Sequence, residues 1–196
     1  MTNKAEQRRK QLLKAAFQAA SDKGYESVTL QDIADYAGVS KGVTNYYFQN
    51  KADVFAHLFE WLTTRIYEKE SKSIDEKETA IEKLEAYMNQ VFISPEENKT
   101  FYRVYLDFLS QTKTNERYKE INKQFYQNCW SIGRRIVAQG LEEQVFHVED
   151  VEEAAIAIRS MIDGSLIQWL MRDEEHLHRS YREVCHQSIL RMLKYE

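Results

Sequence analysis

The side chains of this 196-residue chain with the clearest capacity for chemistry lie in one short run near its start. Val43 and Thr44 each carry a methyl group, and Asn45 carries an amide. In the major groove of DNA, a methyl group can meet the methyl of thymine and an Asn amide can pair with adenine. The run is therefore suited to reading base edges, provided that a helix presents it.

Other kinds of chemistry find little support in the residue pattern. We find no Ser/His/Asp order, no Gly-rich phosphate loop and no defensible pair of catalytic carboxylates. The five histidines form no metal-binding motif, and Cys129 and Cys185 are isolated from each other and from His. The sequence therefore predicts a protein that is not an enzyme and that uses no metal or cofactor.

Composition favours long helices and a cytoplasmic setting. The chain has one proline and six glycines, whereas sheet proteins need many such residues in their turns. No segment approaches the roughly 18 consecutive apolar residues of a membrane span. The first residues are interrupted by charge, unlike a secretory signal, and two isolated cysteines suit a reducing compartment. We expect an all-α cytoplasmic protein with no membrane partner.

The charge is unevenly distributed along the chain. Residues 1–51 contain eight Lys or Arg and five Asp or Glu, which gives +3, and the remaining residues carry −7. A small basic segment beside an acidic remainder favours local contact with phosphate groups over wrapping of nucleic acid around the whole surface.

The elements that must hold the base-reading run are three helices, of which the second and third are short. Apolar residues at helical spacing predict a first helix over about 4–22, which Gly24 ends. Thr29 precedes a second helix and Asp32 lies at its third position, where an acid suits a helix start. Gly38 ends this helix, and Ser40 is placed to cap a third, from Lys41 to about residue 47. Two short helices joined by a glycine turn form a helix-turn-helix.

Apolar periodicity predicts further helices in the remainder, for a total of about nine. A long helix begins at Lys51, and Pro95 marks the first turn of another. We expect later helices over residues 115–139, ending near Gly140, and over 150–172 and 174–193. No convincing strand is found.

Residues 28–51 resemble the DNA-binding signature of the TetR/AcrR family of transcriptional regulators, and the resemblance covers about residues 8–60. The matching residues are Thr29, Ile33, Ala34, Ala37, Gly38, Val39, Ser40, Lys41, Gly42, Tyr47, Phe48 and Lys51. Many family members have a Leu-Tyr pair where this chain has Thr44 and Asn45. The recognition segment is more similar to the choline-responsive, BetI-like branch, although choline is not thereby implied as the ligand.

The resemblance implies a helix-turn-helix domain over residues 1–50 and a ligand-sensing, dimer-forming domain over residues 51–196. It implies a dimeric repressor that binds a palindromic operator in double-stranded DNA and is released by a small molecule. Gly38 would adopt a positive φ, Ser40 would cap the recognition helix, and Tyr47 and Lys51 would contact phosphates. Val43, Thr44 and Asn45 would point outward. The expected DNA-binding residues are Thr29, Ser40, Lys41, Gly42, Val43, Thr44, Asn45, Tyr47 and Lys51.

The larger segment is rich in aromatic residues, several of them beside the main apolar stripes. Such residues suit a pocket for a mostly apolar or aromatic small molecule. The expected ligand-binding residues are Tyr102, Tyr105, Phe108, Tyr126 and Trp130.

Residues 154–170 are apolar almost all round, which predicts a helix buried on two sides. One side would pack on the body. The other, where Gly164 and Ser165 permit close crossing, would face the second subunit of a homodimer. Asp163 is then either a polar group of that interface, which we favour, or a polar residue of the pocket.

Two alternative functions are open at this point. A DNA-binding regulator controlled by a protein partner rather than a ligand would share every feature of the first 60 residues. A helical enzyme would need a catalytic constellation, which the pattern does not supply.

Overall fold

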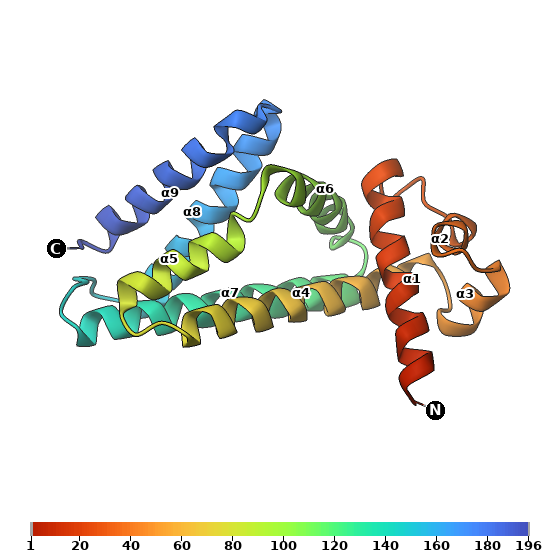
Figure 1. The fold of residues 1–196 in the computed structure, drawn as a ribbon, viewed down its shortest axis with the longest axis horizontal. Helices are drawn as coiled ribbons and strands as arrows, with labels where there is room; N and C mark the ends of the chain where they lie inside the picture. The colour runs from red at the N-terminus through yellow and green to blue at the C-terminus, as the bar shows by residue number, and fades with distance from the viewer. Residues whose placement is uncertain (1, 196) are drawn as a thin grey trace. The chain divides into compact units, whose positions relative to one another are not determined.

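The computed structural model describes residues 2–195, with side chains from residue 4 onward. These residues form nine α-helices and one short 3-10 helix, and none of them lies in a strand (Figure 1). The predicted all-α fold of about nine helices is confirmed. The helices are α1 (Thr2–Lys23), α2 (Leu30–Ala37), α3 (Lys41–Tyr47), α4 (Lys51–Asp75), α5 (Ala80–Val91), α6 (Pro95–Gln111), α7 (Glu116–Glu142), α8 (Val151–Arg172), η1 (Glu175–Leu177) and α9 (His178–Met192).

The chain divides into two compact units. The head unit comprises Met1–Thr64 and Arg103–Lys123, and the body unit comprises Arg65–Tyr102 and Gln124–Glu196. Helices α4, α6 and α7 each contribute residues to both units. Among the described helices, none is both long enough and apolar enough to cross a bilayer.

Helices α1, α2 and α3 of the head unit pack around a small apolar core. Helix α2 packs on α1, and α3 packs on α2 (Figure 1). Leu12 and Ala16 of α1 and Ile33 and Ala34 of α2 are fully buried. The small alanines allow the helix axes to approach closely, so the expected three-helix arrangement is formed with short connections.

Aromatic rings from distant parts of the chain complete the core of the head unit. Phe59 of α4 stacks on Phe108 of α6 with ring centroids 3.7 Å apart, and Phe108 lies 4.7 Å from Tyr118 of α7. Tyr25, in the loop after α1, contacts Phe55 edge-on at 4.8 Å. Each buried ring removes a large apolar surface from water, so this stack joins α4, α6 and α7 firmly within the unit.

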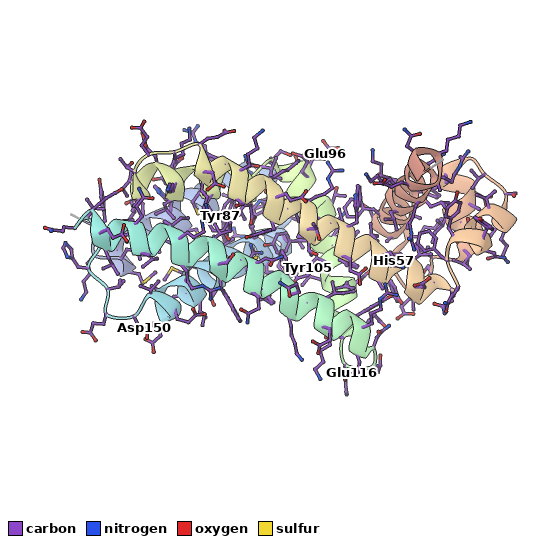
Figure 2. All side chains as sticks on the ribbon, turned by 90° about the horizontal axis from the view of Figure 1, so that it is seen from below. His57, Tyr87, Glu96, Tyr105, Glu116 and Asp150 are labelled. Atoms are coloured by element: carbon purple, nitrogen blue, oxygen red, sulfur yellow. The ribbon has the colours of Figure 1, made fainter. Side chains whose placement is uncertain are left out.

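In the body unit, α8 and α9 lie side by side as an antiparallel pair (Figure 1). The Asp150 carboxylate caps α8 by accepting hydrogen bonds from the N–H groups of Glu152 and Glu153, at 2.7 and 3.0 Å (Figure 2). The helix expected over 174–193 is interrupted at its start, because the first turn is the separate 3-10 helix η1.

The predicted end of a helix near Gly140 is confirmed, but Gly140 itself does not terminate the helix. Helix α7 continues to Glu142, and Gly140 is buried inside its last turns. A Cβ at this position would overlap the ring of Phe146, which is itself buried. Gly140 is therefore explained by the space that the Phe146 ring occupies rather than by helix termination.

Candidate nucleic-acid interface

The first helix of the helix-turn-helix begins with a complete capping box. Thr29 Oγ1 accepts a hydrogen bond from the Asp32 N–H at 3.1 Å, and the Asp32 carboxylate accepts one from the Thr29 N–H at 2.8 Å. Lys23 Nζ also contacts Asp32 at 2.5 Å. Together the Lys23 ammonium and the Thr29 donors hold the pKa of the Asp32 carboxyl well below its usual range. The expected start of the helix at Thr29 is confirmed, and Thr29 itself is exposed.

The turn between the two helices depends on Gly38. Its φ is +64°, in the left-handed region, and its N–H donates to the carbonyls of Ala34 and Asp35. Nothing lies within 4 Å of where a Cβ would be. The positive φ, and not a lack of space, therefore favours glycine here, as the sequence predicted.

The capping role expected for the Ser40 side chain is wrong. Ser40 is the residue before α3 and has an extended backbone, but its hydroxyl makes no capping hydrogen bond. The Val43 N–H, which a capping side chain would bind, donates instead to the Ser40 carbonyl at 2.9 Å. Ser40 is exposed beside the start of the helix.

Helix α3 presents one face outward and one inward. Lys41, Gly42, Asn45 and Tyr46 are exposed, and Tyr46 is 82% exposed. Residues i, i+1, i+4 and i+5 share one side of a helix, so these four form a continuous outer face, which we call the reading face. Sequence reasoning did not assign Tyr46. Tyr46 follows Asn45 and lies four residues after Gly42, so helical spacing could have placed it on the same outer face as these two residues.

The expectation that Thr44 points outward is wrong. Thr44 is 0% exposed, and its hydroxyl has no hydrogen-bond partner among the described residues. It lies one helical turn before Phe48, which is also buried, so both occupy the inner side of α3. Val43 and Tyr47, also expected at the interface, are partly exposed at the border of the reading face.

Lys51 already has partners within the protein. Its Nζ donates to the carbonyls of Tyr25 and Glu26, both at 3.0 Å, and lies 4.6 Å from the centre of the Tyr25 ring. Lys51 therefore ties the first turn of α4 to the loop after α1. An ammonium has three donors, so one N–H remains for the phosphate contact that the sequence predicted.

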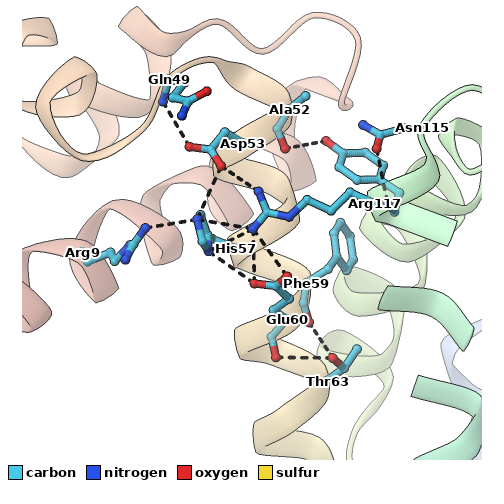
Figure 3. A network of polar contacts seen from close by, with 11 residues as sticks. Arg9, Gln49, Ala52, Asp53, His57, Phe59, Glu60, Thr63, Asn115 and Arg117 are labelled. Carbon is cyan, nitrogen blue, oxygen red and sulfur yellow. Dashed lines mark hydrogen bonds and ion pairs between the residues drawn. The ribbon is translucent and has the colours of Figure 1, made fainter. Parts of the chain in front are cut away.

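A polar network that the sequence did not predict joins three helices of the head unit (Figure 3). Arg9 of α1 contacts His57 Nε2 of α4 at 3.1 Å, and Arg117 of α7 donates to Asp53 of α4 at 2.8 Å. Arg117 also lies 3.4 Å from the Glu60 carboxylate. Burial opposes the ionisation of Asp53, but hydrogen bonds from the Gln49 N–H and Arg117 still lower its pKa.

The network also supports the end of the reading helix. The Arg9 guanidinium lies 5.3 Å from the centre of the Phe48 ring, and the His57 ring is 5.7 Å from it. Phe48 is the residue that follows α3. Single exposed ion pairs contribute little to stability, but the network fixes the side chains around Phe48 and so helps to hold α3 in place.

The five expected ligand-binding residues are divided between the two units. Tyr105 and Phe108 are buried in the head unit, where the Tyr105 hydroxyl donates to Asn122 at 2.8 Å (Figure 2). Tyr102, Tyr126 and Trp130 belong to the body unit, and the rings of Tyr126 and Trp130 are stacked at 5.9 Å.

Asp163 lies inside the body unit, in a buried polar cluster. Its carboxylate accepts hydrogen bonds from Arg159 Nε and Nη2, at 3.0 and 2.6 Å, and from the Tyr102 hydroxyl at 2.9 Å. Arg159 is almost fully buried and lies 5.1 Å from the centre of the Phe125 ring. Asp163 therefore has its hydrogen-bond partners inside the body unit. The two sequence interpretations, an interface group or a pocket residue, both stay predictions.

Helix α8 is buried on one side only. Ala155, Ile158, Ile162 and Leu166 pack inside the body unit. Ile156 and Met171 are exposed, and Val184 of α9 is 65% exposed. At Gly164, nothing lies within 4 Å of a Cβ position. Helices α8 and α9 thus carry three exposed apolar side chains and an open glycine.

The chain is similar to known regulators over most of its length. A family model described as "Bacterial regulatory proteins, tetR family" matches residues 12–58, and one described as "BetI-type transcriptional repressor, C-terminal" matches residues 80–194. The fatty acid metabolism regulator protein of Bacillus subtilis (strain 168) is 27% identical over 169 residues, which cover 85% of each chain.

Solved structures share the fold. A regulator from Saccharomonospora viridis in complex with choline superposes with a TM-score of 0.86 at 20% identity, covering 94% of this chain and 96% of that one. The regulator FadR from Bacillus subtilis in complex with stearoyl-CoA gives a TM-score of 0.72 at 24% identity, covering 89% and 96%.

Proposed function

Because this chain belongs to the TetR family of bacterial regulatory proteins, we propose that it is a homodimeric repressor that binds a palindromic operator and is released by a small-molecule effector. The chain is a transcriptional regulator and not an enzyme, since both matched family models describe regulators. The observation that carries the proposal for DNA is the reading face of α3, held outward by the Gly38 turn and by buried Thr44 and Phe48.

The reading face is suited to the major groove. Gly42 brings the backbone of α3 close to the DNA, Lys41 supplies a positive charge, and Asn45 offers an amide to a base edge. Tyr46 is added to the residues predicted from the sequence. Thr29, Ser40, Tyr47 and the remaining N–H of Lys51 would contact the phosphate backbone, and Val43 would meet a base at the border of this face.

The outer side of α8 and α9 is the proposed dimer interface. Exposed Ile156, Met171 and Val184 would be buried there, and the open position at Gly164 would allow a helix of the second subunit to approach closely. Two copies would place their recognition helices about 34–36 Å apart, as successive major grooves require.

A small-molecule effector is supported by two structural neighbours. One was solved with choline and the other with stearoyl-CoA, so this fold accommodates ligands of very different size. We retain residues 51–196 as the proposed sensing and dimer-forming domain, behind a DNA-binding domain at 1–50. Some dimer conformations would hold the two recognition helices at a spacing that does not fit the operator. A ligand that binds more tightly to such a conformation would increase its population and so weaken operator binding. Control by a protein partner is the alternative.

Footprinting of the promoters of its own gene and of neighbouring genes tests the proposed function. We expect one protected site with two-fold symmetry and half-sites about one helical turn apart. Equal binding to all DNA fragments, with no protected site, would contradict it.

The contribution of the reading face is tested with Asn45→Ala. The variant should lose about 1–3 kcal/mol of discrimination at particular base pairs, because the amide no longer pairs with a base edge. Competition titrations with operator variants measure this loss. Gln18→Ala, at an exposed position on α1, is the control and should leave the preferred site unchanged. Unaltered base preference in Asn45→Ala would show that another residue occupies that position.

The proposed dimer interface is tested with Gly164→Trp. The indole would occupy the space into which the second subunit must pack, so the variant should sediment as a monomer or aggregate where the wild type is a dimer. Analytical ultracentrifugation measures this. Lys72→Trp, whose parent side chain is 80% exposed on α4, controls for the added apolar ring. A Gly164→Trp protein that remains a normal dimer would exclude this part of α8 from the interface.

A further inference from the structure

Two polar side chains of the reading face are free to bind a partner. Lys41 and Asn45 are exposed, and neither the ammonium nor the amide makes a hydrogen bond or an ion pair with another described residue. A polar group in this state can bond to a base without first losing a bond inside the protein. Thr44, directly before Asn45, is buried and so offers nothing to an external group. Apart from the Tyr46 hydroxyl, the side-chain polar groups of the reading face are therefore those of Lys41 and Asn45.

Gly42 lies on the same face, and the fold does not require a glycine there. A Cβ at this position would meet only the Ser40 hydroxyl, at an ordinary contact distance of 3.7 Å. Gly42 is also not one of the residues with a positive φ. Glycine is less favourable than alanine within a helix. Close approach of DNA to the backbone of α3 would explain why a glycine occupies this position.

The ammonium group of Lys41 selects guanine among the four bases. An ammonium has three N–H donors and no acceptor. In the major groove guanine presents two neighbouring acceptors, O6 and N7. Adenine places an amino donor beside its N7, cytosine presents an amino donor, and thymine presents a single acceptor beside its methyl group. Guanine is therefore the base that fits Lys41 best.

The amide of Asn45 and the ring of Tyr46 together fit an A·T pair. An amide has a donor and an acceptor side by side, and these match N7 and the amino group of adenine. The Tyr46 ring is 82% exposed and lies edge-on to the Tyr47 ring, with centroids 5.1 Å apart. A thymine in the same or the adjoining base pair would place its methyl group against this apolar ring.

The helix geometry sets the distance between the two bases. Lys41 and Asn45 are four residues apart on α3, which corresponds to about 6 Å along the helix axis. Successive base pairs of DNA are about 3.4 Å apart. A helix that follows the major groove would therefore present these two side chains to bases about two base pairs apart.

We propose that each half of the operator carries a guanine, bound by Lys41, and an adenine about two base pairs away, bound by Asn45, with Tyr46 against a thymine methyl group. This inference rests on the proposed operator-binding function and names the bases that the same face recognises. No residue of the reading face has a carboxylate, the group that accepts a hydrogen bond from cytosine, so cytosine is recognised only through its guanine partner.

Selection of binding sites by the full-length protein, from a pool of random-sequence duplexes, tests the half-site. We expect a two-fold symmetric consensus in which each half carries a guanine and an adenine about two base pairs apart. A symmetric consensus without this pair of bases would overturn the inference and leave the repressor proposal standing. If no sequence were enriched, the repressor proposal would fail as well.

Selections with variants assign each base to its side chain. Lys41→Met keeps a long side chain without the ammonium, so it should lose the preference for guanine and keep that for adenine. Asn45→Ala should do the reverse. Lys41→Arg, whose guanidinium donates to the same two acceptors, should keep the guanine. Lys14→Met removes an equal charge from an exposed position of α1 and should keep both bases. Unchanged preferences in Lys41→Met and Asn45→Ala would overturn the assignment.

Modified bases test the contacts atom by atom in competition titrations. Replacing the guanine with 7-deazaguanine removes N7 and should weaken wild-type binding severalfold, with no further loss in Lys41→Met. Replacing the thymine with uracil removes its methyl group and should weaken binding severalfold in the wild type and in Tyr46→Phe, but not in Tyr46→Ala. A loss on 7-deazaguanine that persisted in Lys41→Met would reject the guanine contact. A loss on uracil that persisted in Tyr46→Ala would reject the thymine contact.

Discussion

Asp163→Ala should lower the free energy of unfolding by about 3–5 kcal/mol, because it leaves a buried charge without its partner. The Arg159 guanidinium is almost fully buried and donates twice to this carboxylate, and the Tyr102 hydroxyl donates a third time. The Arg159 charge cannot be relieved by deprotonation, since a guanidinium remains charged in proteins. Urea unfolding at one fixed protein concentration measures the loss.

A double variant separates the net contribution of the pair from the cost of breaking it. Replacing both partners, as Arg159→Met with Asp163→Leu, removes both charges and fills the space with apolar atoms of similar size. This protein should regain most of the lost stability, because buried ion pairs are often replaceable by apolar residues. If Asp163→Ala cost less than about 1 kcal/mol, the pair would have to be accessible to water.

Gly140→Ala should lower the free energy of unfolding by about 3 kcal/mol, at the upper end of the cost of overpacking. Alanine ordinarily stabilises a helix relative to glycine by about 1 kcal/mol, so the sign of the effect is itself informative. Here the added methyl group meets the buried ring of Phe146, which must move. The measurement is again unfolding in urea.

Phe146, whose ring the added methyl group would overlap, provides the control. Phe146→Ala alone should destabilise the protein by about 3–5 kcal/mol through the cavity that it leaves. Adding Gly140→Ala to that variant should then cost nothing further, because the methyl group has room. Additive losses in the double variant would mean that Gly140 is required for another reason.

The helix-turn-helix could be predicted in detail because its determinants are local. The Thr29 capping box spans four residues, and the turn at Gly38 depends on the φ of a single residue. The exception within this segment is instructive. Thr44 was predicted to face outward because it lies between Val43 and Asn45. Whether a side chain faces outward depends on which side of the helix packs against the rest of the protein, and the adjacent residues do not determine that.

The body could be predicted only as a set of helices, because its side-chain pairs come from helices far apart in the chain. Tyr102 and Asp163 are 61 residues apart, and nothing in the local pattern of either one predicts their hydrogen bond. Glu70 lies among charged residues, which are usually exposed, yet it is buried. Gly140 was likewise interpreted from local helix rules, whereas Phe146 accounts for it.

The composition of the head unit has a consequence for building chimeric regulators. Residues 103–123 pack with the first 64 residues, through the Phe59–Phe108 stack and the Arg117–Asp53 ion pair. A graft of residues 1–64 alone onto a foreign body would therefore expose Phe59 and leave Asp53 without its arginine. The transplantable module is discontinuous, so an exchange of operator specificity between relatives should carry the α6–α7 connection along with the N-terminal segment, or be limited to the reading face.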